Sequence, residues 1–342
     1  MTPDPFILRR AFLKTVASAG AAAMLAGCDR SKPSDGMAKK PADQAATQTG
    51  VDQSEQLAPT ARLKIATCTE PWRDQPIEDV IRLAGELGFD GVELAHFTIA
   101  DDVREISADR RREMARAASE AGIEIVGLHW LFVSPKGLHL TTPDAEVRQK
   151  AADYIKHLAD FCGDLGGRVM IFGSPKQRST EPPNTFEEGW KRAKEVFLTT
   201  GDTLAARDVT LCIEALAPAE TNFVNTLDEA TRLADEIGHP NIDVMLDTKA
   251  MSFMPEGVLT TIQRFGARAK HFHANEAGGK GVGMPIGPNE PAAIDFKQAV
   301  AALVATGYHR WISLEPFDYS PDPTTVARTG LKVIQEALAA AG

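Results

Sequence analysis

The sequence predicts one large α/β domain of the (β/α)8 TIM-barrel class. Eight short runs of apolar and β-branched residues alternate along 62–342 with eight longer stretches that have the apolar period of a helix. This alternation is typical of a parallel sheet covered by helices, and eight such units favour a closed barrel. A doubly wound open sheet is the alternative, but no G-x-G-x-x-G motif follows the first apolar run.

The elements of the barrel can be assigned in chain order. The predicted strands lie at 63–67, 91–95, 123–129, 168–173, 209–215, 242–247, 269–274 and 311–316. The predicted helices lie at 76–87, 107–121, 144–165, 185–206, 226–237, 256–266, 295–306 and 323–340. Glycine is expected just past the end of a helix, and it stands there five times, at Gly88, Gly122, Gly166, Gly238 and Gly307. Active sites of this barrel class lie at the C-terminal ends of the strands, so polar residues there are candidates for function.

The start of the chain has a different pattern. Residues 1–28 combine the pair Arg9-Arg10, an apolar stretch too short to span a bilayer, and small residues before Cys28. This pattern resembles a twin-arginine export signal that ends in a lipoprotein box. The resemblance implies that Cys28 is lipidated, and that the mature protein is exported and anchored by its lipid on the periplasmic side of the membrane.

Residues 29–61 are polar, with almost no large apolar residues, and predict a disordered tether between the lipid and the domain at 62–342. The net charge of the whole chain is −10, and residues 1–28 carry three basic residues against one acidic residue. The chain after them is therefore still more negative, which argues against nucleic acid as a partner. The remaining cysteines, Cys68, Cys162 and Cys212, lie far apart and match no zinc-ligand spacing.

Metal-type donors follow four consecutive predicted strands. They are Glu214 after the fifth, Asp247 after the sixth, His271 and His273 in the seventh, and Glu315 after the eighth. Burying one unpaired carboxylate is costly, whereas a divalent cation would hold three of them together in one barrel mouth. Three carboxylates and one imidazole suit Mn²⁺, Mg²⁺ or Co²⁺, with Zn²⁺ as a further alternative. Strand alternation puts both histidines on one side, so spacing does not choose between them.

Three stretches accompany these donors: "LGFDGVEL" at 87–94, "ALAPAETNFVNT" at 215–226 and "PIGPNEPAAIDF" at 285–296. With them, the sequence resembles the xylose isomerase-like TIM-barrel superfamily, in its sugar (phosphate) isomerase/epimerase branch, over roughly 62–340.

The resemblance implies one divalent metal ion, with Mn²⁺ as the first choice, held by Glu214, Asp247, His273 and Glu315. It therefore selects His273 over His271 as the ligand. It also implies that the two glutamates of this set act as acid and base in the reaction.

The resemblance further implies that Glu220 contacts the substrate. Two departures concern the sugar: Ala250 stands where tagatose 3-epimerase-like enzymes have a substrate-contacting histidine, and 274–290 contains no arginine, only Lys280. The resemblance to the family therefore predicts the metal site of this chain but not which sugar it binds.

Other residues at or beside strand ends are candidates for substrate binding, namely His96, His129, Trp130, Lys249 and His271. The glycine-rich stretch 277–283 predicts a flexible lid rather than a phosphate cradle, since no helix start follows it directly. The stretch 174–179 after the fourth strand predicts an ordinary surface loop.

The function predicted from these residues is a metal-dependent isomerase or epimerase of a sugar or keto-sugar, which transfers a proton through a metal-stabilised enediolate. A lyase or hydratase on a 3-keto-sugar or keto-glycoside would use the same site, and a sugar-binding lipoprotein without catalysis is a further alternative. The endonuclease branch of the superfamily needs a three-metal cluster with more histidine ligands, and an acidic exported protein is a poor match for it. The expected partners are a small sugar and the membrane through the lipid, and the prediction includes a homo-oligomer.

Overall fold

The computed structural model describes residues 63–289 and 291–342. The predicted export signal at 1–28, its Cys28 and the predicted tether at 29–61 lie outside the described residues. Among the described residues, no helix combines the length and apolar character needed to cross a membrane.

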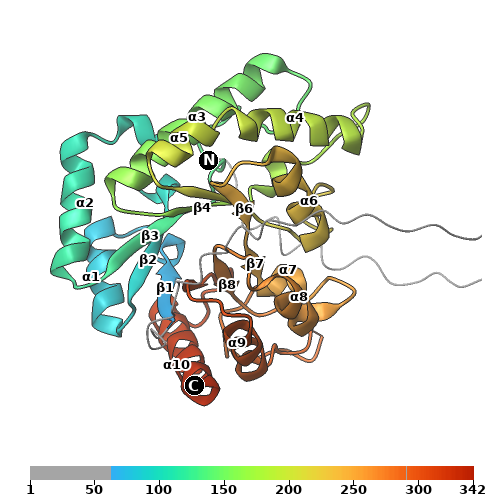
Figure 1. Cartoon of the computed structure of the whole chain (residues 1–342). Helices are drawn as coiled ribbons and strands as arrows, with labels where there is room; N and C mark the ends of the chain where they lie inside the picture. Colours follow the sequence, from blue (N-terminus) through green and yellow to red (C-terminus); the bar gives the residue numbers. More distant parts are fainter. Residues whose placement is uncertain (1–62, 290) are drawn as a thin grey trace, which may run out of the picture. The chain divides into compact units, whose positions relative to one another are not determined.

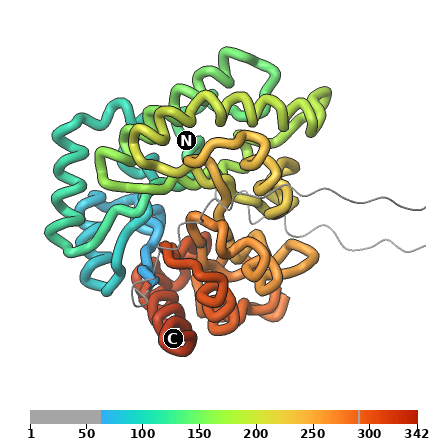
Figure 2. Tube along the Cα trace, in the orientation of Figure 1, coloured from blue at the N-terminus to red at the C-terminus, as the bar shows by residue number. Residues whose placement is uncertain are grey.

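The described chain forms the predicted barrel of parallel strands with helices outside it (Figure 1). The strands are β1 (Lys64–Cys68), β2 (Gly91–Ala95), β3 (Glu124–His129), β4 (Val169–Phe172), β5 (Thr210–Ile213), β6 (Ile242–Val244), β7 (Leu246–Asp247), β8 (Phe272–Ala274) and β9 (Trp311–Leu314). Their order in the sheet is β6-β5-β4-β3-β2-β1-β9-β8-β7. The first strand pairs with the last, and Figure 2 shows these ends of the described chain side by side.

The sixth predicted strand is present as two short segments. β6 pairs with β5, whereas β7 pairs with β8, and only Met245 separates the two. The barrel is therefore closed by one strand whose first half bonds to one neighbour and whose second half bonds to the other. With β6 and β7 counted as one, the eight predicted strands are confirmed.

The helices follow the predicted order. They are α1 (Ile77–Leu87), α2 (Ala108–Glu120), α3 (Ala145–Asp164), α4 (Phe186–Leu198), α5 (Gly201–Ala206), α6 (Leu227–Ile237), α7 (Thr248–Met251), α8 (Gly257–Phe265), α9 (Phe296–Ala305) and α10 (Pro323–Ala341). The predicted helix 185–206 is divided between α4 and α5. The hydroxyls of Thr199 and Thr200 donate to the carbonyls of Val196 and Phe197, and such bonds compete with the helical ladder.

Local sequence signals fix where several helices begin and end. Thr185 and Thr226 begin α4 and α6 with reciprocal capping boxes, which satisfy backbone N–H groups that the first turn leaves free. Gly88 ends α1 with φ of 95° and Gly238 ends α6 with φ of 67°, a backbone conformation that favours glycine. These caps set the length of each helix and so return the chain to the start of the next strand.

The core has two parts, on the two faces of the strands. A large cluster joins the strands to the helices, while a smaller one contains strand residues and Met245 but no helix residue, and it fills the inside of the barrel. The inner residues are Ala66, Val126, Val169, Ile171, Cys212 and Met245. Because much of the inside is packed with apolar side chains, the C-terminal ends of the strands are the main place where polar side chains can gather.

Candidate metal centre and active site

Four predicted ligands lie together at the C-terminal ends of their strands. Glu214 follows β5, Asp247 ends β7, His273 lies in β8 and Glu315 follows β9. Their ligand atoms all lie within 4.8 Å of one another, and each residue is at most 6% exposed. We call these four residues the donor cluster. The predicted strand-end set is thus brought together by the barrel, and it could hold a metal ion.

The ring of His273 directs one nitrogen toward two carboxylates of the donor cluster. Its Nδ1 lies 3.1 Å from Glu315 Oε2 and 3.8 Å from Glu214 Oε1, yet it forms no hydrogen bond within the described part of the chain. Buried polar atoms in proteins are nearly always bonded, so an unbonded ring nitrogen facing carboxylate oxygens needs an explanation. Three carboxylates and one imidazole nitrogen supply the donors that a divalent ion requires, and the residues present fit such an ion.

Glu93 on β2 orients this ring and was missed by the sequence analysis. It is fully buried, and its carboxylate contacts Nε2 of His273 at 3.1 Å and Nε2 of His271 at 2.7 Å. Burial alone would raise the pKa of Glu93, but the two histidines bring it well below its ordinary value. Both predicted histidines therefore meet the same carboxylate, and of the two only His273 joins the donor cluster.

The pKa values of the three acids in the donor cluster are shifted in different directions. Burial, and then the charges of Glu214 and Glu315, raise the pKa of Asp247 to about 7. Burial also raises the pKa of Glu214. For Glu315 the same burial is outweighed by His273 and by a hydrogen bond with His129, so its pKa falls below the ordinary range. A divalent ion would offset the repulsion among the three acids.

Neighbouring groups fix the orientation of Asp247. Its Oδ1 accepts a hydrogen bond from the backbone N–H of Ala250 at 2.6 Å, in the first turn of α7. Its Oδ2 accepts from Nδ2 of Asn275 at 3.1 Å, which ties β7 to the end of β8. The short helix that follows β7 therefore presents this carboxylate to the cluster in one orientation.

The segment after β4 fixes Glu214 from the other side. A Cβ at Gly173 would lie 2.2 Å from Glu214 Oε2, so only glycine leaves room for this carboxylate. Arg178 is 1% exposed and donates to the backbone carbonyl of Glu214 at 2.6 Å. The prediction that 174–179 is an ordinary surface loop is therefore wrong. A basic residue among polar neighbours does not reveal its burial in the sequence.

His129 and Trp130, predicted substrate-binding residues at the end of β3, both contact a cluster carboxylate. Nδ1 of His129 lies 3.3 Å from Glu315 Oε1, and Nε1 of Trp130 donates to the same oxygen at 3.1 Å. The other ring nitrogen of His129 lies 3.1 Å from the carboxylate of Glu70, a residue the sequence analysis did not single out. Burial would lower the pKa of His129, but Glu70 and Glu315 raise it to about 10.

The remaining predicted substrate-binding residues, Glu220, Lys249 and His96, are not equally buried. Nζ of Lys249 lies 2.6 Å from Glu220 Oε2, with both side chains 13% exposed, and it also lies 4.9 Å from the ring centre of Phe317. His96 is fully buried, and its Nε2 lies 3.1 Å from the carbonyl of Leu131. Burial lowers the pKa of His96 to about 4, so it is neutral at physiological pH.

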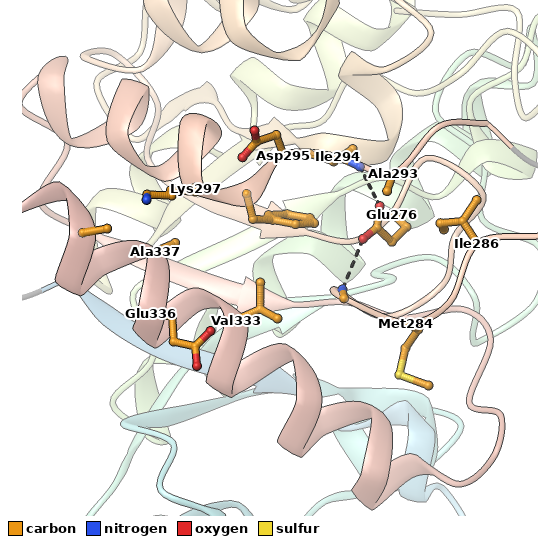
Figure 3. A pocket seen from close by; sticks show the side chains of 13 residues that line it. Glu276, Met284, Ile286, Ala293, Ile294, Asp295, Lys297, Val333, Glu336 and Ala337 are labelled. Carbon is orange, nitrogen blue, oxygen red and sulfur yellow. Dashed lines mark hydrogen bonds between the residues drawn. The ribbon is translucent and has the colours of Figure 1, made fainter.

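The glycine-rich stretch 277–283 is fixed by its neighbours. Glu276 is buried and accepts backbone hydrogen bonds from Gly283 and Ile294, as Figure 3 shows. A Cβ at Gly281 would lie 2.3 Å from Val326 of α10, so glycine allows the stretch to pack closely on that helix. The cavity in Figure 3 has a volume of about 570 Å³ and none of the donor cluster lines it.

Comparisons with known proteins identify the family of this chain. A family model described as xylose isomerase-like TIM barrel matches residues 81–337. The chain belongs to this family. A probable ketose 3-epimerase of Synechocystis is 23% identical over 300 residues, which cover 80% of this chain and 96% of that protein.

Solved structures of the family have the same fold. The D-psicose 3-epimerase of Clostridium cellulolyticum H10, solved with D-tagatose, superposes with a TM-score of 0.69 at 20% identity, covering 82% of this chain and 99% of that one. The 3-keto-D-glucoside 4-epimerase of Escherichia coli gives a TM-score of 0.68 at 17% identity, covering 80% of this chain and all of the other. At these identities the structural likeness supports the barrel fold alone.

Proposed function

We propose that this chain is an enzyme, a sugar epimerase that uses one divalent metal ion and inverts a carbon next to the carbonyl of a ketose or keto-sugar. The observation that carries the proposal is the buried donor cluster, in which ligand atoms of three carboxylates and of His273 all lie within 4.8 Å of one another. Support for the reaction class comes from relatives named as ketose 3-epimerases.

The reaction needs a group that removes a proton from carbon and a group that returns one from the opposite side. Glu214 and Glu315 come from β5 and β9, which are separated by other strands around the barrel. A sugar bound between them would have one carboxylate toward each face. A divalent ion in the cluster would supply positive charge beside the substrate oxygens, which makes the carbon-bound hydrogen more acidic.

The two carboxylates are prepared differently for these tasks. Oε1 of Glu315 already accepts from Trp130 and contacts His129, which stabilises its ionised form. Among residues 63–289 and 291–342, Glu214 has no such pair of donors on its second oxygen, which lies beside Gly173. We infer that Glu214 takes and returns protons on one face of the sugar while Glu315 serves the other.

Mn²⁺ is the proposed ion, because three oxygen donors and one nitrogen donor match its preference. The pair Glu220 and Lys249, at the partly exposed edge of the site, is proposed to contact substrate hydroxyls. Lys249 precedes Ala250, where similar epimerases have a histidine. The sugar is therefore expected to differ from the simple ketoses that those enzymes use.

We further propose that the protein works outside the cytoplasm. The support is the sequence of residues 1–28, with its arginine pair and its cysteine after small residues. Lipid on Cys28 would hold the barrel at the periplasmic side of the membrane.

A screen of substrates in D₂O tests the proposal. The full chain, loaded with Mn²⁺, is incubated with free ketoses and with 3-keto-glycosides, and the products are followed by NMR. An epimerase is expected to give the inverted sugar with deuterium at the inverted carbon. Loss of water or of the aglycone would instead identify a lyase or hydratase, and binding without any turnover would identify a binding protein.

A further inference from the structure

Glu70 is a buried acid that none of the roles described so far explains. It lies in a short 3₁₀ turn, Glu70–Trp72, directly after β1, and it is 1% exposed. Neither oxygen of its carboxylate forms a regular hydrogen bond within the described part of the chain. Its Oε2 lies 3.1 Å from Nε2 of His129. A buried carboxyl group without regular hydrogen bonds is costly to keep, so its contact with His129 calls for a reason.

Through this contact, His129 is fixed at both ring nitrogens. Nε2 faces Glu70, and Nδ1 lies 3.3 Å from Oε1 of Glu315. Trp130 donates to the same oxygen at 3.1 Å, from a backbone with φ of 55° that is strained for so large a side chain. Strain that persists beside a candidate active site indicates that this geometry is needed.

The result is that the two oxygens of Glu315 have different surroundings. Oε1 faces His129 and Trp130, whereas Oε2 lies 3.1 Å from Nδ1 of His273 inside the donor cluster. A rotation of the carboxylate about its last bond would exchange the two oxygens. Contacts on Oε1 oppose this rotation and keep Oε2 directed at the cluster.

We propose that Glu70 is a positioning residue, which fixes the ring of His129 so that His129 and Trp130 hold the carboxylate of Glu315 in one orientation. This inference rests on the proposed function, in which Glu315 transfers a proton. Proton transfer to carbon depends steeply on geometry, and a misplacement of about 1 Å costs about 10²-fold in rate.

A second metal site is the rival explanation. Donor atoms of Cys68, Glu70 and His129 lie within 4.8 Å of one another, and all three residues are buried. The observations favour positioning, because Nε2 of His129, the nitrogen that would bind such an ion, already lies 3.1 Å from Oε2 of Glu70, while Nδ1 lies 3.3 Å from Glu315. A second metal is therefore an outcome of the test.

Three single variants of the full chain and one double variant separate these explanations. Glu70→Met keeps the approximate shape but removes the oxygen that lies 3.1 Å from Nε2 of His129, whereas Glu70→Gln keeps one oxygen there. We expect Glu70→Met to lower kcat about 10²-fold with KM and Mn²⁺ content nearly unchanged, and Glu70→Gln to recover most of this loss. His129→Leu should lower kcat similarly. The double variant should lose little more, since both changes remove one chain of contacts.

Glu124→Met is the matched control, because this exposed glutamate lies at the opposite end of β3. Thermal unfolding shows whether each variant is folded, and metal-loaded crystal structures of the parent and Glu70→Met show whether Oε1 of Glu315 leaves Nδ1 of His129. Parent-like kcat in both a folded Glu70→Met and a folded His129→Leu would overturn the inference while leaving the proposed function intact.

Two further results are decisive. A second equivalent of Mn²⁺ or Zn²⁺ per chain, lost in Cys68→Ser, would assign the trio to metal binding and overturn the positioning role. If the parent epimerises no sugar, the proposed function fails. The crystal structures then decide the inference alone, and an unmoved Glu315 in Glu70→Met contradicts it.

Discussion

The carboxylate of Glu93 lies 3.1 Å from Nε2 of His273, which leaves Nδ1 of the same ring directed at the donor cluster. A histidine that binds metal through one nitrogen usually donates its other N–H to such a carboxylate, which fixes the ring and its tautomer. The side chain of Glu93, on β2, thus orients His273, on β8, which is the nitrogen donor of the cluster.

Glu93→Gln is expected to weaken metal binding without removing it. Loss of an outer carboxylate of this kind costs about 10- to 100-fold in metal affinity. Isothermal titration calorimetry of the metal-free protein with Mn²⁺ measures the change in affinity. His273→Ala and Asp247→Asn should lower metal content further, and Glu124→Gln should bind like the parent. Full occupancy in the His273 and Asp247 variants would argue against this site.

Glu214→Gln and Glu315→Gln are expected to lose activity even when the metal is restored. Each change keeps the size of the side chain and one oxygen but removes the group that accepts a proton. General acid–base catalysis contributes about 10²–10⁴-fold, so we expect losses of that order in kcat with substrate still bound. If kcat of both metal-loaded variants stays within about tenfold of the parent, the activation free energy has changed by only about 1.4 kcal/mol. The two-carboxylate mechanism is then wrong.

Gly173→Ala is expected to disturb Glu214 selectively. The added Cβ would lie 2.2 Å from Oε2 of this residue, so the carboxylate must move away from its place in the cluster. Metal affinity and kcat should fall while the melting temperature changes by a few degrees. Gly278→Ala is the control, since the atom nearest to its Cβ would be 4.0 Å away. Equal metal affinity in the two variants would show that Glu214 tolerates the shift.

In the metal-free protein, His129 should stabilise the folded state at acidic pH, and this stabilisation should be lost at alkaline pH. Its pKa rises from 6.5 to about 10 on folding, so the folded state binds the proton more tightly than the unfolded one. The stabilisation is complete below pH 6.5 and is lost as the pH rises toward about 10. Thermal unfolding of the parent and His129→Gln in EDTA measures it, with the exposed His309→Gln as control. A constant difference across this range would contradict the prediction.

The mature protein is expected to lack residues 1–27 and to carry lipid on Cys28. Intact mass of protein extracted from membranes measures both features, and Cys28→Ser should release the protein from the membrane fraction. A mass that includes Met1, or an unmodified Cys28, would contradict the export prediction.

The strands and the donor cluster could be predicted because both follow local rules. Strand periodicity and the glycines after helices place the elements, and acids that directly follow apolar runs mark the strand ends, as at Glu214 and Glu315. The family resemblance then chose His273. These signals lie within a few residues of each site and need no knowledge of which strands are neighbours.

Glu93 and Glu70 were missed because their roles depend on distant partners. Glu93 lies in the middle of a buried strand and meets histidines 178 and 180 residues later in the chain. Only the alignment of β2 with the far strands across the barrel brings them together. An acid in the run 91–95 is itself a signal, since a charge buried in a strand requires a partner.

The division of the sixth strand at Met245 has a consequence for how the barrel opens. The backbone N–H of Leu246 donates to the backbone carbonyl of His271 at 3.1 Å, and that of Met245 donates to the backbone carbonyl of Ile213 at 3.4 Å. The two sides of the closure are therefore bonded by different residues. Asp247 lies two residues beyond this seam, so an ion held by Asp247 and Glu214 would link the strand that carries the seam to β5 and strengthen the closure.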